Sequence, residues 1–134
     1  MRTWGGRFTG ETDQRVADFT SSIEIDAALA ADARAKLARH GFANVRIEIG
    51  DGARGFGSDT YDAIVLTGST PVLPDRFFEQ LVPGGRLFAV VGEAPVMKAR
   101  LIRWEAPGAK RMTDLFETVV APLANAATPA RFVF

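Results

Sequence analysis

The sequence contains no cysteine, a single histidine and no excess of charge of either sign. Without cysteine, disulfides, thiolate metal sites and a cysteine nucleophile are excluded. Sixteen Lys and Arg residues balance sixteen Asp and Glu residues, so no net field attracts the chain to nucleic acid or to an anionic membrane. No apolar run approaches the roughly 20 residues of a membrane span, and the N-terminal residues lack the apolar stretch of a signal peptide. We therefore expect a cytoplasmic protein with no nucleic-acid or membrane partner.

The rest of the composition is that of an ordinary globular domain. The 134 residues are 47% hydrophobic and 24% charged, enough for one domain with its own core. Apolar runs of strand length alternate with amphipathic runs of helical length. Strands are predicted at 21–26, 44–50, 62–68 and 86–92, and helices at 12–19, 27–40 and 75–82. This succession predicts an α/β domain with a mainly parallel sheet.

The helix over 27–40 has the clearest boundaries. Asp26 is suited to cap its amino end, and Gly41 is suited to end it. Its predicted apolar face consists of residues four apart, namely Leu29, Ala33 and Leu37. His40, in the last turn, suits the negative end of the helix dipole and has no metal-ligand spacing around it. We assign it no catalytic role.

The two ends of the chain are predicted to be extended. Residues 1–12 are rich in Gly and Thr and predict a loop or a short extended arm. The runs 98–106 and 111–120, joined by the turn sequence PGAK, predict an antiparallel hairpin at the sheet edge. The apolar end of the tail, residues 125–134, is expected to pack down. The pair Phe77 and Phe78, together with Trp104, are interpreted as core or hairpin packing.

Residues 50–55 read GDGARG and match the glycine pattern of dinucleotide-binding loops. The strand that such a loop requires precedes it. The helix is missing, because only eight residues separate Gly52 from the next strand-like run, and two more glycines lie among them. We therefore reject a dinucleotide loop here.

A longer pattern points to a family. The segments SIEIDAALAADARAKLARHGFANVRIEIGDG and YDAIVLTGSTPVLPDRFFEQLVPGGRLFAVVGE, with the closing LFETVVAPLANA, resemble the C-terminal half of protein-L-isoaspartate O-methyltransferase over residues 21–134. The resemblance implies a Rossmann-like class I methyltransferase sheet. It also implies S-adenosylmethionine as cofactor and protein or peptide substrates with isoaspartyl residues, whose carboxylates are methylated to start repair.

The same resemblance assigns a cofactor site. Glu24, which ends the second strand of the family fold, would accept hydrogen bonds from the ribose hydroxyls. Asp51 would lie near the adenine amino group, and Gly52 would let the backbone approach. Thr67, within the segment Leu66–Thr70 at the carboxyl end of the fourth strand, completes the set. Without the resemblance, Glu24 and Asp51 are more simply interpreted as solvated acids at strand ends. No catalytic residue and no metal ligand is assigned.

The N-terminal region departs from this family. The first strand and its glycine-rich loop have no counterpart, and residues 4–26 instead resemble the N-terminus of argininosuccinate lyase. Ser22 and Asp26 match lyase residues that touch substrate, but the catalytic regions of that enzyme are absent, so lyase activity is not expected. We divide the chain into an arm of foreign origin, residues 1–20, and a partial methyltransferase domain, residues 21–134.

Three expectations follow from this division. Either the strand at 22–25 pairs directly with the strand at 62–68, or the arm (residues 1–10) fills the gap between them. Glu24 and Asp51 face a common cleft at one edge of the sheet. The chain alone binds its cofactor weakly and does not turn over. The alternative is a non-catalytic α/β remnant or interaction module, stable as a homo-oligomer that covers an exposed sheet edge.

Overall fold

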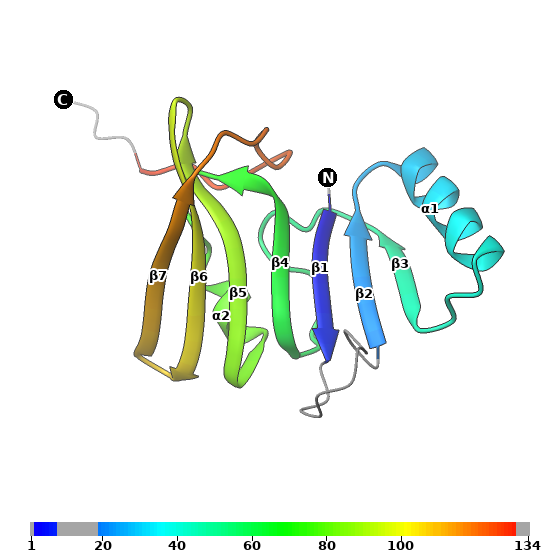
Figure 1. The fold of residues 1–134 in the computed structure, drawn as a ribbon, viewed down its shortest axis with the longest axis horizontal. Helices are drawn as coiled ribbons and strands as arrows, with labels where there is room; N and C mark the ends of the chain where they lie inside the picture. The colour runs from blue at the N-terminus through cyan, green and yellow to red at the C-terminus, as the bar shows by residue number, and fades with distance from the viewer. Residues whose placement is uncertain (1, 8–18, 131–134) are drawn as a thin grey trace.

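In the computed structural model, which describes residues 2–7 and 19–130, a single twisted sheet organises the chain (Figure 1). Its strands follow the spatial order β3-β2-β1-β4-β5-β6-β7. The strands are β1 (Arg2–Arg7), β2 (Phe19–Glu24), β3 (Val45–Ile49), β4 (Tyr61–Thr70), β5 (Leu81–Glu93), β6 (Val96–Ala106) and β7 (Ala109–Glu117). The helices are α1 (Ala27–Arg39) and α2 (Arg76–Glu79). None of the helices in the described ranges is both long enough and apolar enough to cross a bilayer.

The N-terminal arm fills the gap between β2 and β4, which confirms one of the two arrangements expected from the sequence. Its strand β1 pairs antiparallel with both neighbours, so that Gly5 lies opposite Ser21 on one side and Ile64 on the other. The flanking pairs β2–β3 and β4–β5 are parallel, and β5, β6 and β7 form an antiparallel meander. The sheet is therefore mixed, and the prediction of a mainly parallel sheet needs correction. The cause is the reversed direction of β1, which turns two central pairs antiparallel.

Helix α1 begins and ends as predicted. Asp26 is its N-cap, and the Asp26 Oδ1 accepts from the backbone N–H groups of Ala28 at 2.8 Å and Leu29 at 3.1 Å. Gly41 follows the helix with φ of +74°, a conformation that glycine adopts without strain.

The apolar face of α1 is narrower than predicted. Leu29 is 46% exposed, whereas Ala30 is fully buried and Ala33 and Leu37 are half-buried. The helix packs mainly against β3 and β2, at one end of the sheet. It packs on these strands through small residues such as Ala30 and Ala33, and Leu29 faces solvent.

The main core lies on the other half of the sheet, under α2. It joins residues of β4, α2, β5 and β6 with one residue of the loop before β4 and one of the C-terminal segment: Ala53, Ile64, Leu66, Phe77, Phe78, Leu81, Leu87, Ala89, Ile102 and Leu123. Phe78 also stacks on Trp104 with ring centroids 5.5 Å apart, which confirms the packing role predicted for these aromatic residues. α2 is shorter than the predicted helix at 75–82, because β5 already begins at Leu81, where it pairs with Tyr61.

The C-terminal hairpin of β6 and β7 forms as predicted, and all nine residues of β7 are exposed. Beyond it the chain turns back over β4, where the Ser69 carbonyl accepts from the Leu123 N–H at 2.8 Å. The predicted helix at 12–19 lies outside the described residues except for Phe19, which begins β2. The last four residues of the predicted packed tail also lie outside the described residues.

Candidate functional site

Glu24 and Asp51 lie side by side at the same edge of the sheet, where β2 and β3 end. Glu24 is the last residue of β2 and pairs with Ile49, near the end of the parallel strand β3. The Gly50 N–H donates to the Glu24 carbonyl at 3.0 Å, and Asp51 comes next in the chain. The two acids therefore occupy the carboxyl ends of adjacent parallel strands, the edge at which open α/β sheets bind ligands.

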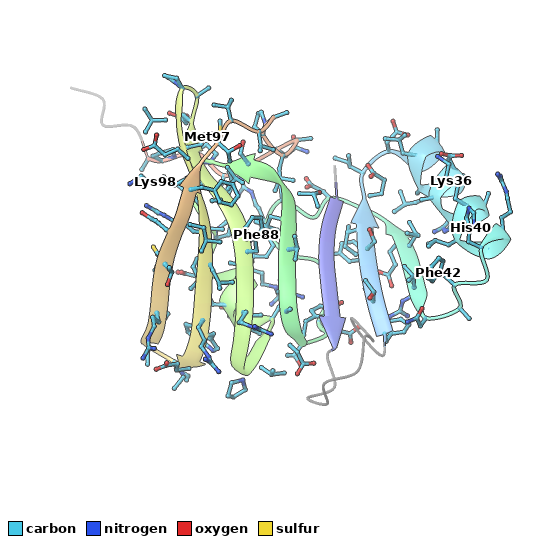
Figure 2. All side chains as sticks on the ribbon, in the orientation of Figure 1. Lys36, His40, Phe42, Phe88, Met97 and Lys98 are labelled. Carbon is cyan, nitrogen blue, oxygen red and sulfur yellow. The ribbon has the colours of Figure 1, made fainter. Side chains whose placement is uncertain are left out.

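The Glu24 side chain is buried rather than solvated. It is 2% exposed, and its Oε1 accepts from the Asp26 N–H at 3.2 Å. It lines a cavity of about 220 Å³ between α1 and the strands β2 and β3. Lys36 and Asp32, joined by an ion pair of 2.7 Å, form the helical rim of this cavity, and Figure 2 shows Lys36 on α1. A carboxylate that is buried beside a cavity differs from the simple solvated acid of the alternative interpretation.

Asp51, by contrast, is exposed and connects its own loop to the C-terminal segment. Its Oδ1 accepts from the Ala53 N–H at 3.0 Å, and its Oδ2 accepts from the Asn125 side-chain amide at 2.9 Å. Asp51 is not among the residues that line the cavity at Glu24. The two carboxylates thus lie at the same edge of the sheet, but of the two only Glu24 lines this cavity.

The other two predicted site residues lie on different sides of β1. Gly52 is half-buried in the loop directly after Asp51, and its carbonyl accepts from the Gly55 N–H at 3.4 Å. Thr67 is exposed on β4 and lies inside the strand, which runs on to Thr70. Gly52 therefore lies next to Asp51. Thr67 is separated from Glu24 by one strand, because β1 lies between β2 and β4.

Asn125 is a residue of this edge that the sequence did not reveal. Its backbone φ of +60° is positive, a conformation that asparagine tolerates better than most residues. Its partner Asp51 is 74 residues away in the chain, so no local pattern connects the two. His40, by comparison, is exposed and caps the carboxyl end of α1 (Figure 2).

Among the described residues, a clear pKa shift is found for Asp114, which lies on β7, the outermost strand on the other side of the sheet. The hydrogen bond from the Arg100 Nε to the Asp114 Oδ1, at 2.7 Å, lowers the pKa of the Asp114 carboxyl below its ordinary value of 3.8. Asp114 is on β7, the strand farthest from β3. This shift reflects a surface ion pair of the hairpin and has no bearing on the edge at Glu24.

The α/β fold, with the parallel pairs β2–β3 and β4–β5 in one sheet and acids at the carboxyl ends of β2 and β3, is Rossmann-like. The model of the family described as Protein-L-isoaspartate(D-aspartate) O-methyltransferase (PCMT) matches residues 13–128. The chain therefore belongs to the protein-L-isoaspartate O-methyltransferase family.

Individual relatives agree with this assignment. The chain is 38% identical over 114 residues to the protein-L-isoaspartate O-methyltransferase of Anaeromyxobacter dehalogenans strain 2CP-C, covering 83% of this chain and 54% of the relative. It is 43% identical over 72 residues to the Pyrococcus abyssi enzyme, covering 53% of this chain and 33% of the relative. The chain thus spans about half or less of the length of these relatives.

Solved structures show the same fold. One protein-L-isoaspartate O-methyltransferase superimposes with a TM-score of 0.69 at 26% identity, over 76% of this chain and 33% of that one. A candidate enzyme of this kind from Plasmodium falciparum, solved in complex with S-adenosyl-L-homocysteine, gives a TM-score of 0.65 at 17% identity. That match covers 75% of this chain and 50% of the other, and it supports the fold alone.

Proposed function

We propose that this chain supplies the adenosine-facing part of an S-adenosylmethionine site in an enzyme that methylates isoaspartyl carboxylates of damaged proteins. The observation that carries the proposal is the placement of Glu24 and Asp51 at the ends of adjacent parallel strands. Family membership supplies the reaction class. The substrates would be proteins or peptides with isoaspartyl residues.

The two acids suit the polar groups of adenosine. A ribose offers two hydroxyl donors and an adenine offers an amino N–H donor, and ionised carboxylates accept both. Glu24 already accepts the Asp26 N–H, and Asp51 accepts from Ala53 and Asn125. A carboxylate has about four acceptor positions, so Asp51 retains capacity for a ligand. Gly52, beside it, would leave the backbone open to the adenine.

The methionine end of the cofactor has less support in the described residues. In the family resemblance, a glycine loop follows a parallel first strand and approaches this part of the cofactor. Here β1 runs in the opposite direction, so its first residue Arg2 pairs with Glu24 and its last residue Arg7 pairs with Phe19. β1 therefore ends at the edge opposite to Glu24. Within residues 2–7 and 19–130, the side chains fit the adenosine part of the cofactor, and none of them fits its methionine part.

This difference predicts weak binding and no turnover. Two missing charge-assisted contacts would remove about 3–6 kcal/mol of binding free energy, at roughly 1.5–3 kcal/mol each. An intact site of about micromolar affinity, roughly 8 kcal/mol, would then become millimolar or weaker. Methyl transfer also requires the sulfonium and the substrate carboxylate to be held within about 3.5 Å, and no described residue positions either group.

A two-part experiment tests the proposal on the purified chain. Adenosine at millimolar concentration should raise the melting temperature, because a ligand that binds only the folded state stabilises it. Radiolabelled S-adenosylmethionine with an isoaspartyl peptide should give no methyl ester above background. Ester formation that Asp51→Ala abolishes would show that the chain is a complete catalyst. No thermal shift at all would remove the adenosine site.

A non-catalytic interaction module is the second candidate, and the edge strand β7 favours it. All nine residues of β7 are exposed, and three of them, Met112, Leu115 and Phe116, are large and apolar. Exposed sheet edges promote pairing between chains. Light scattering over a dilution series tests this: a concentration-dependent dimer supports the module, and a monomer at all concentrations rejects it.

Three further interpretations of the sequence stay predictions. They are the domain boundary near residue 20, the lyase-like origin of residues 4–26, and the cytoplasmic location without nucleic-acid or membrane partners. Sequencing the genomic reading frame around the first codon would test the first two. A frame whose upstream region encodes the missing strand and glycine loop would contradict the foreign origin of the arm.

A further inference from the structure

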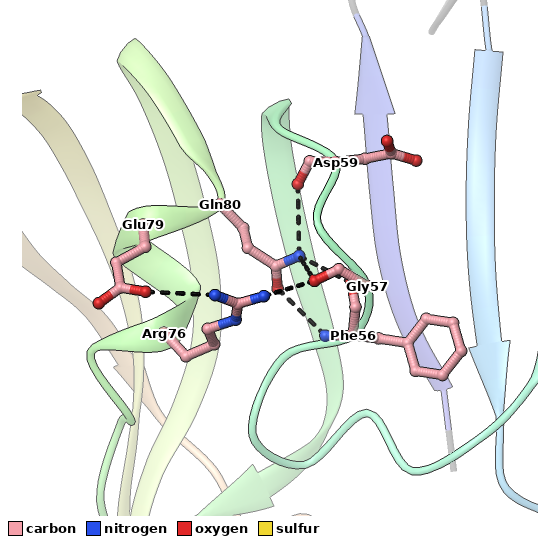
Figure 3. Close-up of polar contacts among 6 residues, drawn as sticks. All are labelled: Phe56, Gly57, Asp59, Arg76, Glu79 and Gln80. Carbon is pink, nitrogen blue, oxygen red and sulfur yellow. Dashed lines mark hydrogen bonds and ion pairs between the residues drawn. The ribbon is translucent and has the colours of Figure 1, made fainter.

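The loop that carries Asp51 is held in place by a glutamine of the neighbouring helical segment. Residues 50–60 connect β3 to β4 and pass close to α2 and to Gln80, the residue that caps the carboxyl end of α2. The Gln80 side chain is 4% exposed. Its Oε1 accepts from the Phe56 N–H at 3.1 Å, and its Nε2 donates to the Phe56 carbonyl at 2.7 Å (Figure 3). A single amide thus pairs with both backbone groups of Phe56, as a β-strand neighbour would.

Two more contacts extend this hold along the loop. The Gln80 Nε2 also approaches the Asp59 carbonyl at 3.3 Å, and the Arg76 Nη2 donates to the Gly57 carbonyl at 2.5 Å (Figure 3). Gly55 lies against the same two side chains. A Cβ on Gly55 would stand 2.6 Å from both the Arg76 Cγ and the Gln80 Oε1, and its φ is +87°. Only glycine meets both demands at this position.

Phe56 connects the Gln80 side chain to the start of the loop. Its ring packs so closely on Gly50 that a Cβ there would overlap the ring edge. Gly50 is the residue that bonds to Glu24, and Asp51 follows it directly. The contacts therefore run from Gln80 through Phe56 to Gly50 and Asp51. The first and last glycines of the GDGARG hexapeptide serve this packing, which explains a dinucleotide-like pattern in a loop without a helix.

We propose that Gln80 is a positioning residue for Asp51, which sets how the Asp51 carboxylate meets the adenine amino group. The inference rests on the proposed function, in which Asp51 faces adenine. Gln80 touches no ligand in this arrangement and acts through the Phe56 backbone. Its loss should weaken the preference for an adenine amino group, while the ribose contact of Glu24 on β2 is left in place.

The test compares adenosine with inosine, which carries an oxo group where adenosine carries the amino group. Gln80→Met keeps the length of the side chain and removes its donor and acceptor, whereas Gln80→Glu keeps an acceptor for the Phe56 N–H. Ile102→Val, a fully buried change in the same core, is the control for general loss of stability. We expect Gln80→Met to lose roughly fivefold or more of the adenosine preference, Gln80→Glu to lose less, and Ile102→Val to retain it.

Two spectroscopic readings separate this inference from the proposed function. In Gln80→Met, hydrogen exchange of the Phe56 amide should accelerate, and the amide resonances of residues 51–53 should shift without any ligand. If those signals stay as in the wild type, the positioning role is wrong, whatever the nucleoside affinities. If they change but the wild-type chain binds adenosine and inosine equally, the adenine contact proposed for Asp51 is wrong. Should Gln80→Met not fold, Gln80→Asn keeps a buried amide but is one methylene group shorter, so it weakens the same two bonds to Phe56. The same two signals then decide the outcome in the same way.

Discussion

The two halves of the sheet are built differently. The half formed by β4, β5, β6 and α2 contains the main apolar core, with Phe77, Leu87 and Ile102 almost completely buried. The half formed by β2, β3 and α1 buries few apolar side chains, among them Ile23, Ala30 and Ile47. Both halves bury polar residues, but those of the first half, Ser69, Thr70 and Gln80, are neutral. Among the described buried residues, the ionisable side chain is Glu24, on β2 of the second half.

This difference suggests that one half of the sheet mainly stabilises the fold and the other half carries the candidate binding site. Apolar burial stabilises a fold at roughly 25 cal/mol per Å², whereas a buried polar group costs free energy unless it is paired. The first half therefore supplies most of the stability. The second half keeps a buried carboxylate beside a cavity, an arrangement that is typical of binding sites. β1 connects the two, since it pairs with β2 and with β4.

The largest effect on unfolding free energy is expected for substitutions that compare the apolar packing of the two halves. Leu87→Ala and Ile47→Ala remove the same number of atoms, one from each half. Leu87 is fully buried, so its loss should cost about 5 kcal/mol of unfolding free energy, whereas Ile47, beside a cavity, should cost about 2 kcal/mol. Urea denaturation measures both values. Equal losses would show that the halves are equally well packed.

The next effect concerns the strand between the halves. Gly5→Pro removes a backbone donor in a strand that is paired on both sides, so we expect a loss of about 3 kcal/mol or more. Gly5→Ala is the matched control, because it retains the N–H. Thermal unfolding measures both. A chain that tolerates proline as well as alanine would contradict the central position of β1.

A smaller effect is expected at the cap of α1. Asp26→Ala removes two hydrogen bonds to the first turn and should cost about 1 kcal/mol, within a range of roughly 0.5–2 kcal/mol. Asp32→Ala, which breaks an exposed ion pair with Lys36, should cost about 0.3–0.5 kcal/mol. Urea midpoints of the two variants rank them. The opposite ranking would mean that the cap does not anchor this thinly packed half.

The smallest effect is a pH dependence in the hairpin. Because Arg100 lowers the pKa of Asp114 in the folded chain, the ion pair stabilises the fold above the ordinary carboxyl pKa of 3.8. That contribution disappears as the pH falls through the lowered pKa. Asp114→Asn should therefore lower the urea midpoint at about pH 7, and the difference from the wild type should shrink as the pH falls below 3.8 and through the lowered pKa. A difference that persists at the acidic pH would point to a packing defect instead.

The candidate site shows which features could be predicted from the sequence and which could not. Glu24 and Asp51 could be placed at one edge because the family resemblance puts each acid at the end of a strand, and adjacent parallel strands end together. The burial of Glu24 could not be foreseen, since it depends on how α1 returns over β2. The partners Asn125 and Gln80 were missed for a similar reason, because they come from segments distant in the chain.

The sequence by itself determined the local elements. Asp26 and Gly41 bound α1, and the alternation of apolar residues around the PGAK turn specifies the hairpin of β6 and β7, because caps and turns depend on neighbouring residues alone. Only the tertiary structure decided that β1 runs antiparallel in the centre of the sheet, and that Gln80 and Asn125 fix the loop and the carboxylate of Asp51. Strand direction and side-chain contacts across the chain depend on which surfaces meet in the folded state. No periodicity along the sequence records that choice.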